Sequence, residues 1–243
     1  MTPHVPIDAE RPEPLGRAAP SLFADKGAFV RHPAGGSGGK GPVEDCAGMA
    51  AAGFEWLVLN VGDHPPDSWA IWRAEAERAD LACGPWARCH DIRDAERLAA
   101  VAYEWYAPLA VWNVEQEAGE PRWRMGGGSL AYVINGSAPP AVAVSTEPWL
   151  PDNFAWHELD QLGIACLPQA FWNDDARWTP SVVTTRARSY FTRVYPTLGV
   201  YPVAARPITP QTLASFYESS VGAGRPFSVY CSDDVPAWEP WTW

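Results

Sequence analysis

Eight short apolar runs, separated by segments of helical character, are the feature of this 243-residue sequence that most limits its fold. Strands that alternate with helices pair in parallel, because each helix returns the chain to the same edge of the sheet. Eight such units predict an α/β protein with a single closed (β/α)8 barrel, with a doubly wound open sheet as the alternative. The runs span residues 21–30, 54–63, 81–89, 109–117, 141–148, 163–172, 197–203 and 226–234.

Helix signals lie between the runs. The segment 42–53 opens with proline and two acids and closes on Gly53, which fits the usual start and stop of a helix. Thr179-Pro180 and Thr209-Pro210 each combine an N-cap residue with proline in the first turn. The fourth unit is irregular, because residues 119–140 hold three consecutive glycines and room for only a short helix, and no helix follows the last run. We expect helices over 42–53, 66–80, 91–107, 151–163, 179–194 and 209–225.

The two ends of the chain differ in composition from the barrel segment 21–234. Residues 1–20 carry five prolines and no apolar periodicity, which predicts an extended arm. Residues 235–243 form a tail with three tryptophans. Both ends are typical of segments that dock on neighbouring subunits.

Charge and hydropathy exclude several classes of partner. The formal net charge of −11 disfavours nucleic acid and anionic membrane surfaces. No run of about 18 apolar residues exists, so we expect no membrane insertion. The first 20 residues lack the apolar stretch of a signal peptide, which predicts synthesis in the cytoplasm. The five cysteines form no CxxC pair and are expected to be reduced, buried thiols.

Neither a metal nor another cofactor is expected. The segment 35–41, GGSGGKG, lacks the spacing of a phosphate-binding loop and predicts a loop after the first strand. His64 and the Cys89-His90-Asp91 triplet match no zinc spacing. A nucleophilic cysteine stays open only at Cys89, beside His90, although strand neighbours point to opposite faces.

The acids of the fourth run, VWNVEQE, lie where barrel enzymes hold their chemistry, at the carboxyl end of a strand. Asn113, Glu115 and Glu117 share one face, because side chains alternate along a strand. Other runs end in acids, amides and tryptophans, which suit sugar hydroxyls and sugar rings. We predict catalytic roles for Glu115, Glu117, Glu147 and Asp25, and substrate binding by Asn113, Trp86, Trp149, Gln169, Trp172 and Asp234. The alternative is that these are solvated strand ends without catalysis.

These features resemble the glycoside-hydrolase-like barrels of phages and actinobacteria, near the family 25 muramidases. The resemblance covers about residues 21–234 and depends on strand order, on Asp25 in the opening run and on Asn-Val-Glu at 113–115. The family has Asp-x-Glu there, which implies that Glu115 is the proton donor, and its further acid near the last strand corresponds to Asp233 or Asp234. Asn113 departs from the pattern, because an amide cannot supply the aspartate's negative charge.

Two functions follow from the resemblance. The first is a barrel that engages bacterial cell-wall or surface glycan as a tail-associated component of a phage virion. The second is a catalytically inactive barrel that serves as a structural or receptor-binding module of a phage tail, with residues 1–20 and 235–243 contacting other virion subunits. A barrel enzyme that acts on an unrelated small molecule is a third possibility.

Overall fold

The computed structural model describes most of the barrel. The described residues are 22–31, 41–62, 66–115, 127–137, 139–148, 150, 154, 156–171, 175, 177–200 and 226–230. The predicted arm (1–20), the tail (235–243) and the predicted helix over 209–225 lie outside them.

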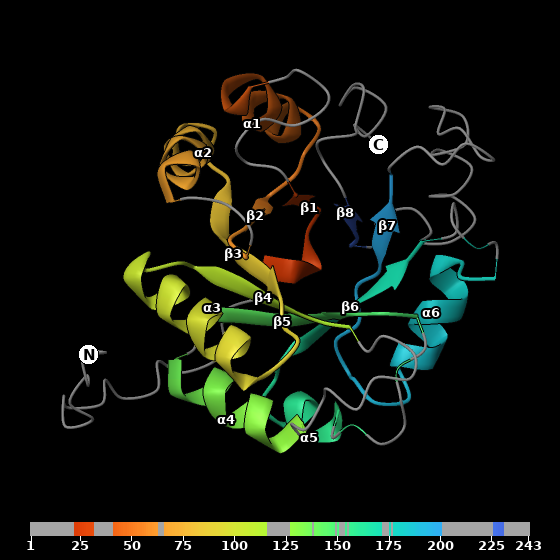
Figure 1. The fold of residues 1–243 in the computed structure, drawn as a ribbon. Coiled ribbons are helices and arrows are strands. Elements are labelled where there is room, and N and C mark those ends of the chain that lie inside the picture. Colours follow the sequence, from red (N-terminus) through yellow and green to blue (C-terminus); the bar gives the residue numbers. More distant parts are fainter. Residues whose placement is uncertain are drawn as a thin grey trace, which may run out of the picture.

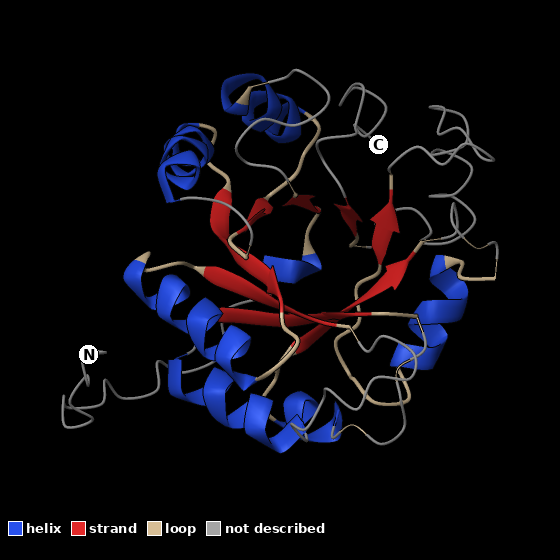
Figure 2. Ribbon diagram, viewed as in Figure 1, coloured by secondary structure: helices blue, strands red, loops and turns tan. Residues whose placement is uncertain are grey.

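Eight parallel strands form a closed ring in which each strand pairs with the next and β8 pairs with β1 (Figures 1 and 2). The closed ring confirms the barrel and rules out the open sheet. The strands are β1 (Gly27–Val30), β2 (Trp56–Asn60), β3 (Ala82–Arg88), β4 (Leu109–Val114), β5 (Ala141–Thr146), β6 (Ala165–Ala170), β7 (Thr197–Gly199) and β8 (Ser228–Tyr230).

Six α-helices in the described part of the chain lie outside the ring of strands (Figure 1). Asp91 caps the third of these helices by accepting the backbone N–H groups of Arg93 and Asp94, and Thr179 caps the sixth by accepting that of Val182. The helices are α1 (Pro42–Ala51), α2 (Pro66–Arg78), α3 (Ile92–Glu104), α4 (Gly127–Ser137), α5 (Trp156–Gln161) and α6 (Pro180–Ala187). None of the described helices is long and apolar enough to cross a membrane.

Two predicted elements differ from the structure. The first apolar run does not form one strand, because a short 3-10 helix, η1 (Leu22–Ala24), precedes β1. The fourth unit has an 11-residue helix, α4, which is longer than its glycine-rich sequence predicted. The barrel is therefore more regular at its fourth unit than the sequence suggested.

The core has two parts, one inside the ring and one between the ring and the helices. Phe29, Trp56 and Val111 belong to the inner part, and Leu57, Trp112 and Val144 belong to the outer part. Neighbouring residues of one strand therefore pack on opposite sides, as the alternation of side chains along a strand requires. This alternation also decides which residues face the mouth of the barrel.

Candidate functional site

The interior of the barrel becomes polar toward the carboxyl ends of the strands. Asn60, Asn113, Ser145 and Gln169 are all buried there. Asn113 lies two residues beyond the interior residue Val111, and Gln169 lies two beyond the interior Leu167, so both side chains face the inside of the ring. The carboxyl end of the barrel is therefore lined by buried amides and a hydroxyl. Asn113, Ser145 and Gln169 pair with one another, while Asn60 Oδ1 accepts the backbone N–H of Gly62.

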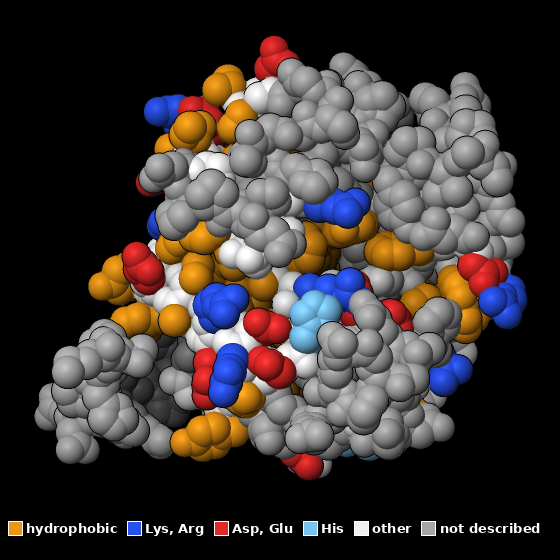
Figure 3. All heavy atoms as spheres, viewed as in Figure 1, with side chains coloured by type: hydrophobic (Ala, Val, Ile, Leu, Met, Phe, Trp, Pro, Cys, Tyr) orange, Lys and Arg blue, Asp and Glu red, His pale blue; other side chains and the backbone are white. Residues whose placement is uncertain are grey.

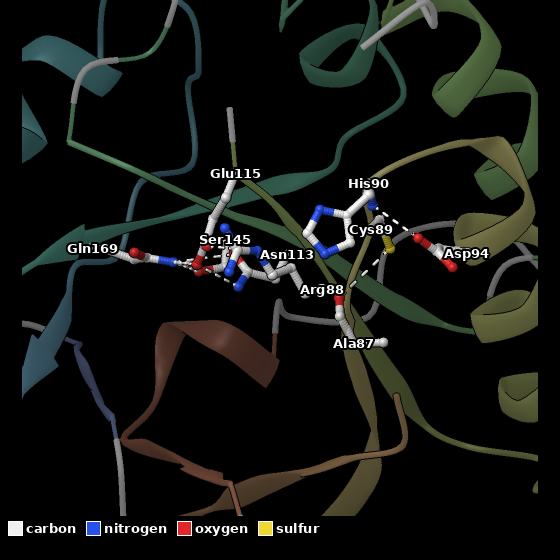
Figure 4. A network of polar contacts seen from close by, with 9 residues as sticks. All are labelled: Ala87, Arg88, Cys89, His90, Asp94, Asn113, Glu115, Ser145 and Gln169. Atoms are coloured by element: carbon white, nitrogen blue, oxygen red, sulfur yellow. Dashed lines mark hydrogen bonds and ion pairs between the residues drawn. The ribbon is translucent and has the colours of Figure 1, made fainter. Parts of the chain in front are cut away.

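Glu115 is the centre of this polar network. Asn113 Nδ2 and Gln169 Nε2 donate to its Oε1 at 2.8 Å and 3.0 Å. Arg88 Nε forms an ion pair with the Oε2 atom at 2.9 Å. Figure 4 shows these side chains converging from three strand ends. In this arrangement both oxygens of Glu115 accept hydrogen from nitrogen donors.

Gln169 connects the ends of three strands, β4, β5 and β6. Its Nε2 lies 3.1 Å from Asn113 Oδ1 and 3.4 Å from Ser145 Oγ, in addition to its bond to Glu115. An amide nitrogen carries two hydrogens, so these three acceptors share them. A shared donor of this kind holds the Glu115 side chain in a fixed position relative to β5 and β6.

Glu147 occupies the position on β5 that corresponds to Glu115 on β4. The pairing of β4 with β5 ends at Val114 and Thr146, and each of these residues is followed directly by one of the two glutamates. Neighbouring strands lie about 4.8 Å apart, so the two carboxyl-bearing residues lie close together at the mouth. Glu147 is half-buried and Glu115 has 17% of its side chain exposed.

An aromatic cluster adjoins the polar network. The rings of Phe171 and Tyr230 stack with centroids 5.4 Å apart, and Tyr230 also packs edge-on against Trp86 and Phe29. Trp86 is 4% exposed and its Nε1 donates to the carbonyl of Val30. The Trp86 indole thus lies inside the barrel and packs with the inner core, and its role in substrate binding stays a prediction.

Asp25 does not belong to this site. It precedes β1 by two residues, at the amino end of the barrel, because the chain forms η1 before the strand begins. Its backbone carbonyl accepts the indole N–H of Trp56 there. The prediction that Asp25 acts as a second carboxylate beside Glu115 is wrong, since the two residues lie at opposite ends of the strands.

Charged side chains of both signs also meet on the surface. On the face seen in Figure 3, acidic and basic side chains lie next to one another near the centre, with a histidine among them.

Five residues that the sequence analysis placed at the mouth of the barrel lie outside the described residues: Glu117, Trp149, Trp172, Asp233 and Asp234.

Cys89 is not an activated nucleophile. Its thiol is buried and lies 3.5 Å from the carbonyl of Ala87, and burial raises its pKa far above the usual value, with Asp94 and Asp91 adding to the effect. The backbone N–H of His90 donates to Asp94, which leads away from the network around Glu115 (Figure 4). Across the described ranges, no three His, Cys, Asp or Glu side chains are grouped so as to hold a metal ion.

Of the residues predicted at the strand ends, the structure joins Asn113, Glu115 and Gln169 in one hydrogen-bonded network, and their roles in catalysis or binding stay predictions. The strand-end argument missed Ser145, which belongs to this network, lies two residues before Glu147 and could have been found by the same alternation. Phe171 and Tyr230 were also missed. Their apolar character matched a core strand equally well.

The comparisons with known proteins identify the fold class. No protein-family model matches the sequence, and a search of curated proteins finds no match. The structure is similar to the Bacillus cereus spore cortex-lytic enzyme SleL, with a TM-score of 0.61 and 10% sequence identity over 90% of this chain and 72% of that one. It is also similar to a D-allulose 3-epimerase from Methylomonas sp., with a TM-score of 0.51 and 12% identity over 84% and 83% of the two chains. At these identities the likeness shows the (β/α)8 barrel alone.

Proposed function

We propose that this protein engages bacterial cell-wall or surface glycan at the carboxyl end of its barrel. The observation that carries the proposal is the network around Glu115, which fixes a carboxylate beside a second glutamate, Glu147, at the end where barrel enzymes bind substrates. The similarity to the SleL barrel, a spore cortex-lytic enzyme, supports a glycan as the ligand.

The chemistry of the mouth suits a sugar. The carboxylates accept hydrogen bonds from hydroxyl groups, and the amides of Asn113 and Gln169 are placed among them. The stacked rings of Phe171 and Tyr230 supply apolar area beside these polar groups. Polar groups converging next to an aromatic surface are typical of small-molecule and carbohydrate sites.

Turnover of the muramidase type would require Glu115 to donate a proton to the glycosidic oxygen, with Glu147 or Glu117 as the second carboxylate. Two observations favour the inactive alternative instead. Nitrogen donors occupy both oxygens of Glu115, and Asn113 replaces the acid that accompanies the proton donor in the family resembled. A barrel that binds glycan without cleaving it is therefore the second candidate.

The test compares cleavage and binding in the same preparations. Reducing-end release from purified bacterial peptidoglycan is measured for the native protein, for Glu115→Gln and for Glu158→Gln, an exposed glutamate on α5. If the native and Glu158→Gln proteins release reducing ends and Glu115→Gln does not, the protein is a glycosidase. Sedimentation with cell walls but no release establishes a binding barrel. If neither release nor sedimentation is observed, the result contradicts a cell-wall ligand.

The resemblance to phage barrels adds a location to the proposal. Under it the protein is a virion component whose residues 1–20 and 235–243 contact other tail subunits. Mass spectrometry of gradient-purified virions from a phage that encodes the protein checks this. If the protein is present at a constant number of copies per virion, the location is supported. If the protein separates from the virions on the gradient, the location is contradicted.

A further inference from the structure

We infer that Asn60 and Gln169 bind hydroxyl groups of a neutral hexose that carries no N-acetyl group, so that the ligand is a surface polysaccharide of such sugars. This inference deepens the proposed function and rests on it. It assigns a binding role to Asn60 and names the class of sugar, neither of which the network around Glu115 determines by itself.

Asn60 and Gln169 belong to one layer of the barrel interior. Alternate strands of such a barrel contribute four side chains to each layer. Asn60 pairs through Trp86 with Val111, and the layer continues two residues further along β4. The same advance of two residues leads on to β6, to β8 and back to Asn60 on β2. The layer, called the floor layer below, consists of Asn60, Asn113, Gln169 and Tyr230.

The backbone of Gly62 fixes the orientation of the Asn60 amide. Its N–H donates to Asn60 Oδ1 at 3.0 Å, and a backbone N–H can only donate. The Nδ2 group of Asn60 therefore points away from Gly62. Within the described part of the chain, no atom accepts a hydrogen bond from this Nδ2 group. Asn60 thus offers a donor to a ligand at the mouth.

The amide of Gln169 offers an acceptor instead. Its Nε2 lies 3.0 Å from Glu115 Oε1, and a carboxylate requires a donor there, so the nitrogen of this amide faces the network. The Oε1 atom of Gln169 lies on the other side of the amide, and no group among the described residues donates to it. β2 and β6 stand on opposite sides of the ring, so the donor and the acceptor do as well.

The burial of both amides makes these open positions significant. Asn60 is 7% exposed and Gln169 is 6% exposed. A buried amide whose donor or acceptor has no protein partner is unfavourable unless water or a ligand supplies one. The floor layer therefore suits a ligand that both accepts and donates hydrogen bonds.

Sugar hydroxyl groups meet this requirement without adding charge, because a hydroxyl both accepts and donates. An acetamido group also offers an acceptor and a donor, but it brings a methyl group into a layer in which both amides are more than nine-tenths buried. The small exposed area favours hydroxyl groups, and hence a neutral hexose over the N-acetylated sugars of peptidoglycan.

The test is calorimetric titration of the 243-residue protein with four tetrasaccharides, those of glucose, galactose, mannose and N-acetylglucosamine. We expect at least one hexose tetrasaccharide to bind at least about tenfold more tightly than the N-acetylglucosamine tetrasaccharide. Asn60→Ser should weaken that binding about tenfold, because the short hydroxyl can still accept from Gly62 but does not reach the ligand. Asn135→Ser, the same change at an exposed position of α4, should leave the affinity unchanged.

Each result supports or overturns the inference. If the native protein binds the N-acetylglucosamine tetrasaccharide as tightly as the hexoses, the sugar class is wrong and glycan binding stands. An unchanged hexose affinity in Asn60→Ser overturns the role of Asn60. If none of the four binds, the inference fails, and sedimentation with cell walls then decides whether the proposed function survives. Should Asn60→Ser not fold, Asn60→Asp keeps the size and the Gly62 bond without an N–H donor, and the affinity should fall there too.

Discussion

The two halves of the barrel interior have opposite chemistry although the same strands build both. At the amino end, β4 and β5 begin with Leu109 and Ala141, which pack in the inner apolar cluster with Trp56. Four residues further along, the same faces present Asn113 and Ser145. With a rise of about 3.3 Å per residue, the two levels lie about 13 Å apart.

This difference separates stability from recognition within one fold. The amino half excludes water with large side chains, and its described polar side chains pair locally: the Trp56 indole donates to the Asp25 carbonyl, and the hydroxyls of Thr197 and Ser228 lie 2.9 Å apart. In the carboxyl half, buried polar groups are satisfied largely by one another, and such groups contribute little net stability while fixing geometry. Substitutions in the amino half should therefore act on unfolding, and those in the carboxyl half mainly on binding.

The largest effect is expected for Trp56→Ala. Trp56 is fully buried, contacts Phe23 at 5.1 Å between ring centroids and closes the amino end of the interior. Removing a buried indole costs about 3–5 kcal/mol in the free energy of unfolding, through lost transfer energy and the cavity left behind. Urea unfolding followed by circular dichroism measures this cost. A change below about 1 kcal/mol would mean that the amino half is not the stabilising half.

Gly84→Ala should come next, at about 3 kcal/mol, the upper end for an overpacked interior. A Cβ at Gly84 would lie 1.9 Å from the carbonyl oxygen of Leu109, a backbone atom that cannot move without shifting β4. Gly136→Ala on α4 is the matched control, because nothing lies within 4 Å of its added methyl group and alanine favours a helix. The control should unfold at equal or higher urea concentration, and a similar loss in both proteins would contradict the steric explanation.

The sequence predicted the order of the elements and the polar strand ends, because both depend on local patterns of period 2 and period 3.6. It did not predict the level of a residue along its strand. The run SLFADKGAFV reads as one strand, yet a helical turn occupies its first half and leaves Asp25 at the wrong end. The depth of Trp86 was not predicted for a related reason, since an indole suits both a core and a sugar-binding surface, and the structure places it in the inner cluster.

The smallest effect on stability, and the sharpest test of the carboxyl half, is expected for Asn113→Asp. Asn113 Nδ2 lies 2.8 Å from Glu115 Oε1, so the substitution places two carboxyl groups in contact. Repulsion between like charges raises the pKa of the introduced carboxyl above its value in the unfolded chain. A group whose pKa is raised by folding contributes stability at low pH and loses it as the pH rises through the folded-state value. Relative to the native protein, the variant should therefore be about 1–2 kcal/mol less stable at pH 7 than at pH 4.

Urea unfolding of both proteins at pH 4, 5.5 and 7 checks this dependence, with reducing-end release from peptidoglycan measured alongside. If the difference in the free energy of unfolding between the two proteins does not change with pH, the carboxyl group of Asp at position 113 does not contact Glu115. Release gained in the variant would show that the missing carboxylate at position 113 is what keeps the native barrel from cleaving glycan, as the Asp-x-Glu pattern implies. A pH-dependent loss of stability without release would instead show that Arg88 and Gln169 still hold Glu115 as an acceptor, so that the barrel binds glycan without cleaving it.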